Sequence, residues 1–306
     1  MDVQQAKSIF RGPMVSVAAP LMPDFELDLP ALRSNIRYMV ERGVRQGQGV
    51  LLVAAAGGEF PMLSVAERKE VTRVSVEAAN GEVPVATSIQ ANGTREVVEL
   101  ARYASEVGAA LGQLSAPYYY EPPDEDIFDL FKAASAESDL TVMVYNNWWN
   151  TLNMNVDMVE RLAELRNVVV LKWSAPSPAQ HSDGLHRMAE RMAIIDNSGQ
   201  HVWSHMMGAV GFITHVSNFW PEYPLEIWNL LEEGDYRGVI AKLGAFKWNW
   251  QKWTGKVVRE SEGAGPFIKA AMEHVGLPAG PPRLPARPVS AGLRDELDEL
   301  LSQRPG

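Results

Sequence analysis

Short apolar stretches of β-strand character recur along the chain, and a stretch with helical periodicity follows each one. The spacing between successive apolar stretches is roughly 20 to 35 residues, which is typical of repeated βα units. We identify eight of them, at Met14–Ala19, Gly49–Ala54, Val83–Ser88, Ala110–Leu114, Thr141–Tyr145, Val168–Lys172, Ala193–Asp196 and Gly211–Thr214. Helices are predicted between them, at Leu32–Arg42, Val65–Ala79, Thr94–Val107, Asp124–Ala136, Val156–Leu165, Ala179–Arg191 and Gln200–Met207. Eight alternating units predict an α/β fold, a closed (β/α)₈ barrel.

The last part of the sequence departs from this alternation. After Trp220-Pro221 we expect helices only, at Glu222–Glu233, Asp235–Trp253, Gly265–Val275 and Arg294–Ser302. The first completes the barrel, and the Pro- and Gly-rich stretch 276–288 is interpreted as an ordered connector between the last two. The predicted organisation is a barrel over residues 1–233 with a C-terminal helical bundle over residues 234–306 packed on it.

Four residues are expected to mark helix ends. Asp124 and Asn155 are predicted N-caps, because their side chains can accept hydrogen bonds from the free N–H groups of a first turn. Gly108 and Gly208 are predicted to end two other helices in the left-handed region, which glycine adopts without steric cost.

Composition narrows the range of functions. The chain has a net charge of −10 and scattered Lys and Arg residues, so it lacks the basic stripe that nucleic acids require. It contains no cysteine, which excludes disulfides, thiolate nucleophiles and cysteine-rich metal sites. No apolar run is long enough to cross a bilayer, and no basic-then-apolar leader precedes Ser8. We expect a cytoplasmic protein with no membrane or nucleic-acid partner.

Two reactive side chains are predicted at the carboxyl ends of neighbouring strands. Lys172 ends the sixth apolar stretch and Tyr145 ends the fifth. Reactive groups of (β/α)₈ barrels come from this face, and burial would lower the pKa of the lysine and free its amine to attack a carbonyl. A nearby phenol could then move protons. The alternatives are a lysine that extends to water and a tyrosine that caps the core.

Two loops on the same predicted face carry further candidates. Ala55–Phe60 follows the second strand, and its small residues leave backbone N–H groups free to meet a carboxylate. Alternatively, Gly57 and Gly58 only permit a tight turn and Glu59 accepts from backbone donors. Pro117–Tyr120 follows the fourth strand and sets three aromatic residues in a row.

Together these pieces resemble the dihydrodipicolinate synthase and N-acetylneuraminate lyase family. The motifs that carry the resemblance are Gly57-Gly58-Glu59, Ala116-Pro117-Tyr118-Tyr119, Val144-Tyr145-Asn146, Val170-Leu171-Lys172, Gly211-Phe212-Ile213-Thr214 and Asn218. The likeness extends over nearly the whole chain, from Arg11-Gly12-Pro13 to Phe267-Ile268-Lys269-Ala270-Ala271 and Gly276-Leu277-Pro278. The order and spacing of several motifs make it specific, whereas each alone would be weak.

The resemblance implies Schiff-base chemistry without a cofactor or a metal. Lys172 would form an imine with the ketone of a 2-oxo acid, commonly pyruvate, and Tyr145 would transfer protons. Tyr119 takes the position of a tyrosine that, in many members, reaches into a neighbouring subunit's site. Ile213 takes a position whose backbone carbonyl faces the reacting centre. Members are commonly tetrameric, so we expect a homo-oligomer, a dimer or a tetramer, whose partner molecule is a small 2-oxo acid.

The chain departs from the family pattern in two carboxylate-binding regions. Members usually carry two hydroxyl residues after the second strand, which hold the pyruvyl carboxylate and continue a proton relay, but here these positions are Ala56 and Gly57. Backbone amides of residues 56 to 58, Gly58 included, could still bind a carboxylate. The arginine that dihydrodipicolinate synthases use for the second substrate falls near Asn150, and an amide cannot replace a bidentate guanidinium. We therefore do not expect true dihydrodipicolinate synthase activity.

Other departures concern the acceptor, the second substrate. Trp173, Trp148 and Trp149 could line an aromatic-walled pocket for a bulky or aromatic acceptor, or could pack the barrel rim or a subunit interface. His215 stands where lyase members place a hydroxyl residue that touches the substrate, and it could act as an acid or base. Ser198 lies in the region where lyases recognise polyol hydroxyls.

We expect a class I lyase, an aldolase or a dehydratase, and three alternatives stay open. Gly58-Glu59-Phe60 also resembles the branch that dehydrates keto-deoxy sugar acids. A metal-dependent barrel enzyme could use Asp196, His201, His205 and His215, although two histidines four apart on an amphipathic helix are more often surface residues. A homologue that binds small acids without catalysis would fit the missing hydroxyl pair.

Overall fold

The strands of the computed structural model close into a barrel in the order β1-β2-β3-β4-β5-β6-β7-β8, as the sequence predicted. The structure describes residues 1–302 and 304. Within that range the eight strands are β1 (Gly12–Ser16), β2 (Val50–Val53), β3 (Val85–Ser88), β4 (Leu111–Leu114), β5 (Thr141–Tyr145), β6 (Val168–Trp173), β7 (Ala193–Asp196) and β8 (Gly211–Thr214). All of the predicted apolar stretches are therefore strands, and β5, β7 and β8 have the predicted bounds.

Helices follow the strands in alternation. The first set is α1 (Val3–Ile9), α2 (Leu29–Glu41), α3 (Val65–Ala79), α4 (Thr94–Glu106), α5 (Asp124–Ala136), α6 (Val156–Leu162), α7 (Pro178–Met188) and α8 (His201–Met206). The second set is α9 (Glu222–Glu232), α10 (Tyr236–Ala245), α11 (Lys247–Glu260), α12 (Gly265–His274) and α13 (Ala291–Leu301), with short 3₁₀ helices at Phe60–Met62 and Val216–Asn218. Within the described range, no helix is both long enough and apolar enough to cross a membrane.

Three details correct the sequence prediction. The helix expected at Asp235–Trp253 is two helices, because the backbone leaves the helical region at Phe246, whose buried ring packs against Trp220 and Tyr223. Asp124 is the first helical residue of α5 and the cap position is Pro123. The N-terminal helix α1 was missed because it is short and buries only Ala6 fully.

The other predicted helix ends are confirmed. Asn155 caps α6, and its side chain accepts a hydrogen bond from the backbone N–H of Met158 at 2.8 Å. Gly108 and Gly208 both have positive φ, 88° and 96°, and each follows the C-cap residue of its helix, α4 or α8. Glycine relieves the steric cost that other residues would meet there.

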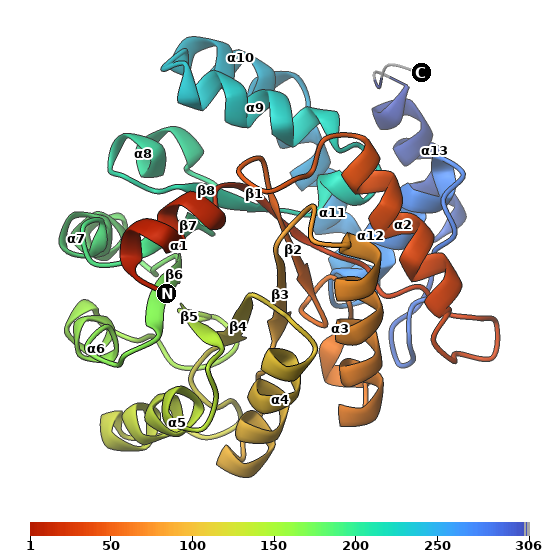
Figure 1. The fold of residues 1–306 in the computed structure, drawn as a ribbon. Helices are drawn as coiled ribbons and strands as arrows, with labels where there is room; N and C mark the ends of the chain where they lie inside the picture. Colours follow the sequence, from red (N-terminus) through yellow and green to blue (C-terminus); the bar gives the residue numbers. More distant parts are fainter. Residues whose placement is uncertain (303, 305–306) are drawn as a thin grey trace. The chain divides into compact units, whose positions relative to one another are not determined.

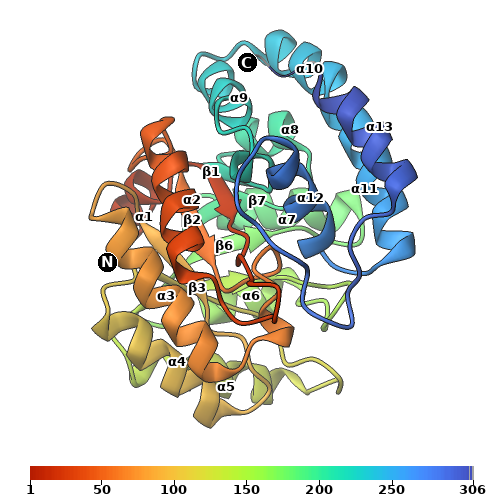
Figure 2. The same ribbon diagram turned by 90° about the vertical axis from the view of Figure 1, so that its right-hand side faces the viewer.

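The chain divides into two compact units that are interleaved in sequence. Unit 1 comprises Met1–Met14, Arg45–Val50 and Gly81–Ile213, and unit 2 comprises Val15–Val44, Leu51–Asn80 and Thr214–Gly306. In unit 1 the helices α4 to α8 lie outside the strands β4 to β8 (Figure 1). In unit 2, α2 and α3 run side by side (Figure 2). The division expected at residue 233 stays a prediction.

A buried ion pair anchors unit 2. Glu59, 5% exposed, follows β2, and its carboxylate lies 2.5 Å from Nζ of Lys269 on α12, which is equally inaccessible. The other oxygen, Oε1, accepts the backbone N–H of Arg283 at 2.9 Å. Lys269 Nζ also donates to the carbonyl of Pro281 at 2.8 Å. The connector predicted at 276–288 is thus tied to the loop after β2. Removal of either Glu59 or Lys269 would leave the charge of the other buried and unpaired.

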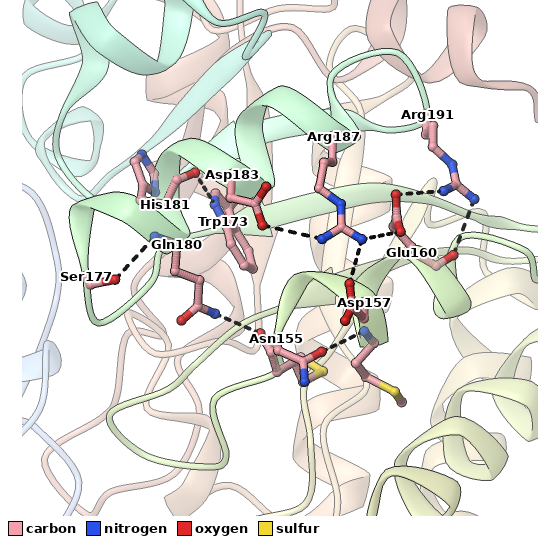
Figure 3. Close-up of polar contacts among 12 residues, drawn as sticks. Asn155, Asp157, Glu160, Trp173, Ser177, Gln180, His181, Asp183, Arg187 and Arg191 are labelled. Atoms are coloured by element: carbon pink, nitrogen blue, oxygen red, sulfur yellow. Dashed lines mark hydrogen bonds and ion pairs between the residues drawn. The ribbon is translucent and has the colours of Figure 1, made fainter.

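The outer face of β6 packs against α7 in unit 1. Trp173 is fully buried, and its indole Nε1 donates to the carbonyl of His181 on α7 at 2.9 Å (Figure 3). A Cβ built at Gly184 on the same helix would overlap the indole ring. Arg187, further along α7, forms ion pairs with Asp157 and Glu160, which holds α7 to α6 (Figure 3).

Gly184→Ala should destabilise the protein by about 1–3 kcal/mol, because the added methyl group has no space beside the indole of Trp173. Denaturant unfolding measures the change in the free energy of unfolding. The matched control is Gly255→Ala on α11, where a Cβ meets no atom within 4 Å in the described structure. It should stabilise by about 0.5–1 kcal/mol through helix propensity. Equal stability of Gly184→Ala and the wild type would contradict the packing argument.

Candidate active site

Lys172 and Tyr145 lie opposite one another at the carboxyl ends of β6 and β5. The two residues are register partners in the parallel pair. Lys172 Nζ lies 3.7 Å from the centroid of the Tyr145 ring. Lys172 is 5% exposed, and burial lowers the pKa of its amine to about 7. A substantial fraction of the amine is therefore unprotonated near neutral pH, as a nucleophile requires.

The phenol of Tyr145 keeps its proton. Burial raises its pKa above the ordinary value, and a hydrogen bond with the side chain of Asn197 opposes that shift without cancelling it. Asn197 follows β7, and its backbone N–H donates to the carbonyl of Trp173 at 2.8 Å. The neutral phenol can donate a proton and take it back, whereas a stable phenolate could only accept one.

Gln113 is a site residue that sequence reasoning missed. It lies on β4 and is 4% exposed, and its Oε1 accepts a hydrogen bond from Nζ of Lys172 at 3.0 Å. Because β5 separates β4 from β6, the two side chains meet across the barrel interior. The signal was present in the sequence, since Gln113 is the one polar residue of the apolar run Leu111–Leu114.

Buried amide contacts order the loop after β5. Asn146 Nδ2 donates to the carbonyl of Ser174 at 2.9 Å, and its Oδ1 accepts the backbone N–H of Met154 at 2.9 Å. Trp149 on this loop packs edge-on against the Tyr145 ring, with centroids 6.2 Å apart, and Trp148 packs against Trp149 at 5.5 Å. The loop therefore holds an exposed aromatic surface beside the reactive phenol.

One expectation about this region changes. Trp173 cannot line a pocket with Trp149, because its side chain lies on the outer face of β6 beneath α7. The reason is the two-residue period of a strand: Lys172 points into the barrel, so Trp173 points out of it. Asn150 is exposed, and its backbone N–H donates to the carbonyl of Asn147 at 3.0 Å. Its role toward the acceptor stays a prediction.

A polar cluster beyond the end of β7 contains Ser198. Asp196 Oδ1 accepts from the Ser198 hydroxyl at 2.6 Å, and Asp196 Oδ2 lies 2.8 Å from His201 Nδ1. Burial works to raise the pKa of Asp196, but His201 and Ser198 outweigh it and hold the pKa at about 2. Ser198 Oγ also lies 3.3 Å from His181 Nε2. The hydroxyl is thus engaged within the protein, and its role in substrate binding stays a prediction.

Asp196 and His201, two residues of the metal-dependent alternative, contact each other. The His201 ring stacks on Phe212 with centroids 4.2 Å apart, and its Nδ1 faces Asp196. Burial and the charge of Arg11 lower the pKa of His205. Among residues 1–302 and 304, no three His, Asp or Glu side chains lie together in an arrangement that could hold a metal ion.

Tyr119 is the most exposed of the predicted catalytic residues. It is 87% exposed and has φ of 81°, a conformation that costs about 1–3 kcal/mol for a residue with a side chain. Its ring packs edge-on against Tyr120 at 5.0 Å. Ile213, at the end of β8, is half-buried. The side chain of Tyr119 is therefore almost entirely open to solvent.

The remaining predicted residues lie in unit 2. The loop after β2 is bounded by Ala54 and Glu59, whose φ angles are 45° and 53°. The backbone N–H of Gly57 donates to Ser16 Oγ at 2.9 Å, so this amide is already engaged. A Cβ at Gly57 would overlap Ser16, which explains the glycine. Ala56 is exposed and Gly58 is buried, and no side chain of residues 56–58 carries a hydroxyl. The role of this loop in carboxylate binding stays a prediction.

His215 is half-buried in unit 2. Its ring packs edge-on against Phe267 of α12 with centroids 5.5 Å apart. Its backbone carbonyl accepts from the side chain of Asn218 at 2.9 Å. Asn218 also donates to the carbonyl of Ser16, so this motif residue orders the ends of β1 and β8 around it. Acid–base work by His215 stays a prediction.

Comparison with known proteins identifies the family of this chain. Residues 9–304 match the model of the dihydrodipicolinate synthetase family. The 4-hydroxy-tetrahydrodipicolinate synthase of Azoarcus sp. is 30% identical over 299 residues, which cover 95% of this chain and 97% of that enzyme. The dihydrodipicolinate synthase structure from Aquifex aeolicus is 27% identical, with a TM-score of 0.85 over 96% of this chain and 97% of that one. The Acinetobacter baumannii synthase, solved with pyruvate, shares the fold at 23% identity, with a TM-score of 0.85 over 96% of this chain and 98% of that one.

The family match covers both units and includes each motif on which the resemblance rested. The buried amine of Lys172 and the protonated phenol of Tyr145 stand at the strand ends that such chemistry requires. The chain belongs to the dihydrodipicolinate synthetase family, as a divergent member that is a class I lyase acting through a lysine imine.

Proposed function

We propose that this lyase condenses Lys172 with pyruvate or another small 2-oxo acid and joins or cleaves an acceptor that is bulkier than that of the synthases it resembles. The observation that carries the proposal is the buried, partly unprotonated amine of Lys172 against the Tyr145 ring. The imine withdraws electrons from the neighbouring carbon, which favours aldol addition, aldol cleavage or loss of water. Tyr145 would supply and recover the protons of these steps.

The carboxylate of the 2-oxo acid would be held by backbone amides. By the family resemblance this is the task of the loop after β2, where Ala56 and Gly57 replace the usual hydroxyl residues. Since the Gly57 amide is bonded to Ser16, the amides of Ala56 and Gly58 are the proposed donors. Amides bind an anion but do not pass a proton onward as a hydroxyl can. The proton relay of the family would therefore not run through this loop.

The aromatic loop after β5 would select the acceptor. Trp149 lies against Tyr145, and Asn150 stands where synthases use an arginine for a second carboxylate. An apolar ring beside the reacting centre favours a bulky or aromatic acceptor over a dianionic one. This disfavours true dihydrodipicolinate synthesis. A keto-deoxy sugar acid dehydratase is the alternative within the family, supported by Gly58-Glu59-Phe60.

A second copy of the chain is the proposed partner of Tyr119. The Tyr119 side chain is 87% exposed and its backbone is left-handed. Such an exposed aromatic side chain on a strained backbone is typical of a surface that another protein covers. By the family resemblance, the phenol would enter a neighbouring subunit's site in a dimer or a tetramer.

Borohydride reduction in the presence of pyruvate should attach a stable adduct to Lys172, detected by intact mass and peptide mapping. The initial trapping rate should rise as the pH increases through about 7, because the pKa of Lys172 is lowered to about 7 and only the unprotonated amine attacks. Lys172→Ala should abolish the adduct, whereas Lys132→Ala, which removes an exposed lysine of α5, should retain it. Full trapping in Lys172→Ala would remove the proposal.

Trp149→Ala should lower kcat/KM about tenfold for aromatic or bulky acceptors, since it removes an aromatic contact beside Tyr145. Pyruvate trapping should change less than about twofold, because imine formation does not use this ring. The measurement is a competition among acceptors of increasing size. Trp203→Ala, which truncates another exposed tryptophan of unit 1, is the control and should leave the preference unchanged. An equal loss for every acceptor would contradict the proposed selectivity.

A further inference from the structure

The nitrogen of Lys172 is held by two neighbours inside the barrel. Gln113 Oε1 accepts a hydrogen bond from Nζ at 3.0 Å, and the Tyr145 ring lies 3.7 Å from Nζ, measured to its centroid. Gln113 comes from β4 and Tyr145 from β5, so two strands fix the position of one atom. Both are electron-rich partners, and both interact more strongly with a charged nitrogen than with a neutral one.

Imine formation changes how many hydrogens this nitrogen carries. The lone pair of the neutral amine attacks C2 of the 2-oxo acid, and one proton moves from nitrogen to the former carbonyl oxygen, giving a carbinolamine. A second proton, supplied by the phenol of Tyr145 in the proposed reaction, protonates the hydroxyl, and water leaves as the nitrogen lone pair forms the C=N bond. The product is a planar iminium that keeps one N–H and carries a positive charge. That single N–H needs an acceptor in a buried site, because an unpaired buried donor is costly.

We propose that Gln113 is a positioning residue for the imine: its carboxamide oxygen accepts the one N–H of the protonated iminium and so fixes the plane of the C=N bond. This inference rests on the proposed function, because it requires that Lys172 forms the imine. A carboxamide suits the task because its oxygen accepts a hydrogen bond at any pH and carries no charge that would bind the free ammonium tightly. The orientation of the C=N plane then determines where the reacting carbon lies relative to Tyr145.

The surroundings of Gln113 argue against a purely structural role. Its register partner on β5 is Met143, whose own partner on β6 is Val170, and both are fully buried apolar residues. An apolar side chain would therefore fit the barrel core at this position without a polar group to satisfy. Gln90, another buried glutamine of unit 1, is different, since it bonds Ser115 and the carbonyl of Ala116 and thereby orders a loop.

Charged groups nearby are engaged elsewhere. Burial alone accounts for the lowered pKa of Lys172. On the elements packed against β6, Asp196 of β7 binds Ser198 and His201, and Lys7 of α1 lies 3.9 Å from Glu190. His181 of α7 contacts Ser198 and Ser204, and the titratable group of β5 is Tyr145 itself. A charge placed at position 113 should therefore dominate the titration of Lys172.

The test follows the pH dependence of borohydride trapping with pyruvate in the full-length protein. Gln113→Glu should raise the pH midpoint by about 1–3 units, because a carboxylate beside Nζ favours the ammonium. Gln113→Leu should lower the midpoint and reduce the limiting rate about 10- to 100-fold, since the iminium N–H loses its acceptor. Gln90→Leu is the matched control: it removes a buried carboxamide that does not touch Lys172, and it should lower stability without moving the midpoint.

Opposite shifts in the two Gln113 variants, with the Gln90 midpoint unchanged, would support the role of Gln113. Midpoints and limiting rates equal to the wild type in a folded Gln113→Leu protein would overturn it, as would an equal change in Gln90→Leu. If Gln113→Glu does not fold, Gln113→Leu alone tests the proposal, because a leucine is similar in volume and its apolar side chain suits the buried neighbours Met143 and Val170. Failure of the wild type to trap any 2-oxo acid would instead overturn the proposed function, so the two failures are distinguishable.

Discussion

The chemistry that we propose depends on the burial of one amine, that of Lys172, whose hydrogen-bond and ring partners in the described part of the chain include no carboxylate. Transfer of an ammonium out of water is costly, and at Lys172 the available compensation is a carboxamide oxygen and an aromatic face. The pKa falls to about 7 as a result. Around this nitrogen lie the strand β6 that carries it, the Tyr145 ring opposite it, and the loop after β5 whose Trp149 packs against that ring.

A second buried lysine, Lys269, shows how the partner of a buried amine changes its properties. Lys269 is as inaccessible as Lys172, and burial lowers its pKa too, but Glu59 opposes that shift. With a carboxylate at 2.5 Å and the Pro281 carbonyl at 2.8 Å, its ammonium ties the connector to the loop after β2. Both lysines end or interrupt apolar runs in the sequence. The partner, rather than the burial, separates the proposed nucleophile Lys172 from the structural cation Lys269.

Much of the fold could be predicted because each strand is a local pattern. The apolar runs are short, helices separate them, and their carboxyl ends bear Tyr145 and Lys172 where the structure places them. The error at Trp173 came from neglecting strand periodicity, since two adjacent residues cannot both face the barrel interior. The break at Phe246 was missed although Gly244 stands two residues before it, because an isolated Gly inside a helical pattern is a weak signal. The ring of Phe246 packs against Trp220 and Tyr223 at this break.

The contacts that tune the site could not be predicted, because they join distant positions. Gln113 meets Lys172 across 59 residues of sequence, and Glu59 meets the amide of Arg283 across 224. A polar residue in an apolar strand is a detectable anomaly, but only the closed barrel identifies its partner as the lysine two strands away.

The carboxamides of Gln113 and Asn197 also affect how protons can move in the site. A hydroxyl both donates and accepts through one oxygen, so a chain of hydroxyls can pass a proton along, whereas an amide donates from nitrogen and accepts at oxygen. Gln113 contacts the amine and Asn197 contacts the phenol. Positions 56 and 57, where the family resemblance would place relay hydroxyls, are Ala56 and Gly57. The two reacting groups are thus held by residues that fix geometry without transferring protons. In the reaction that we propose, the acceptor's own hydroxyl or carbonyl oxygen is the natural partner for a proton that leaves Tyr145.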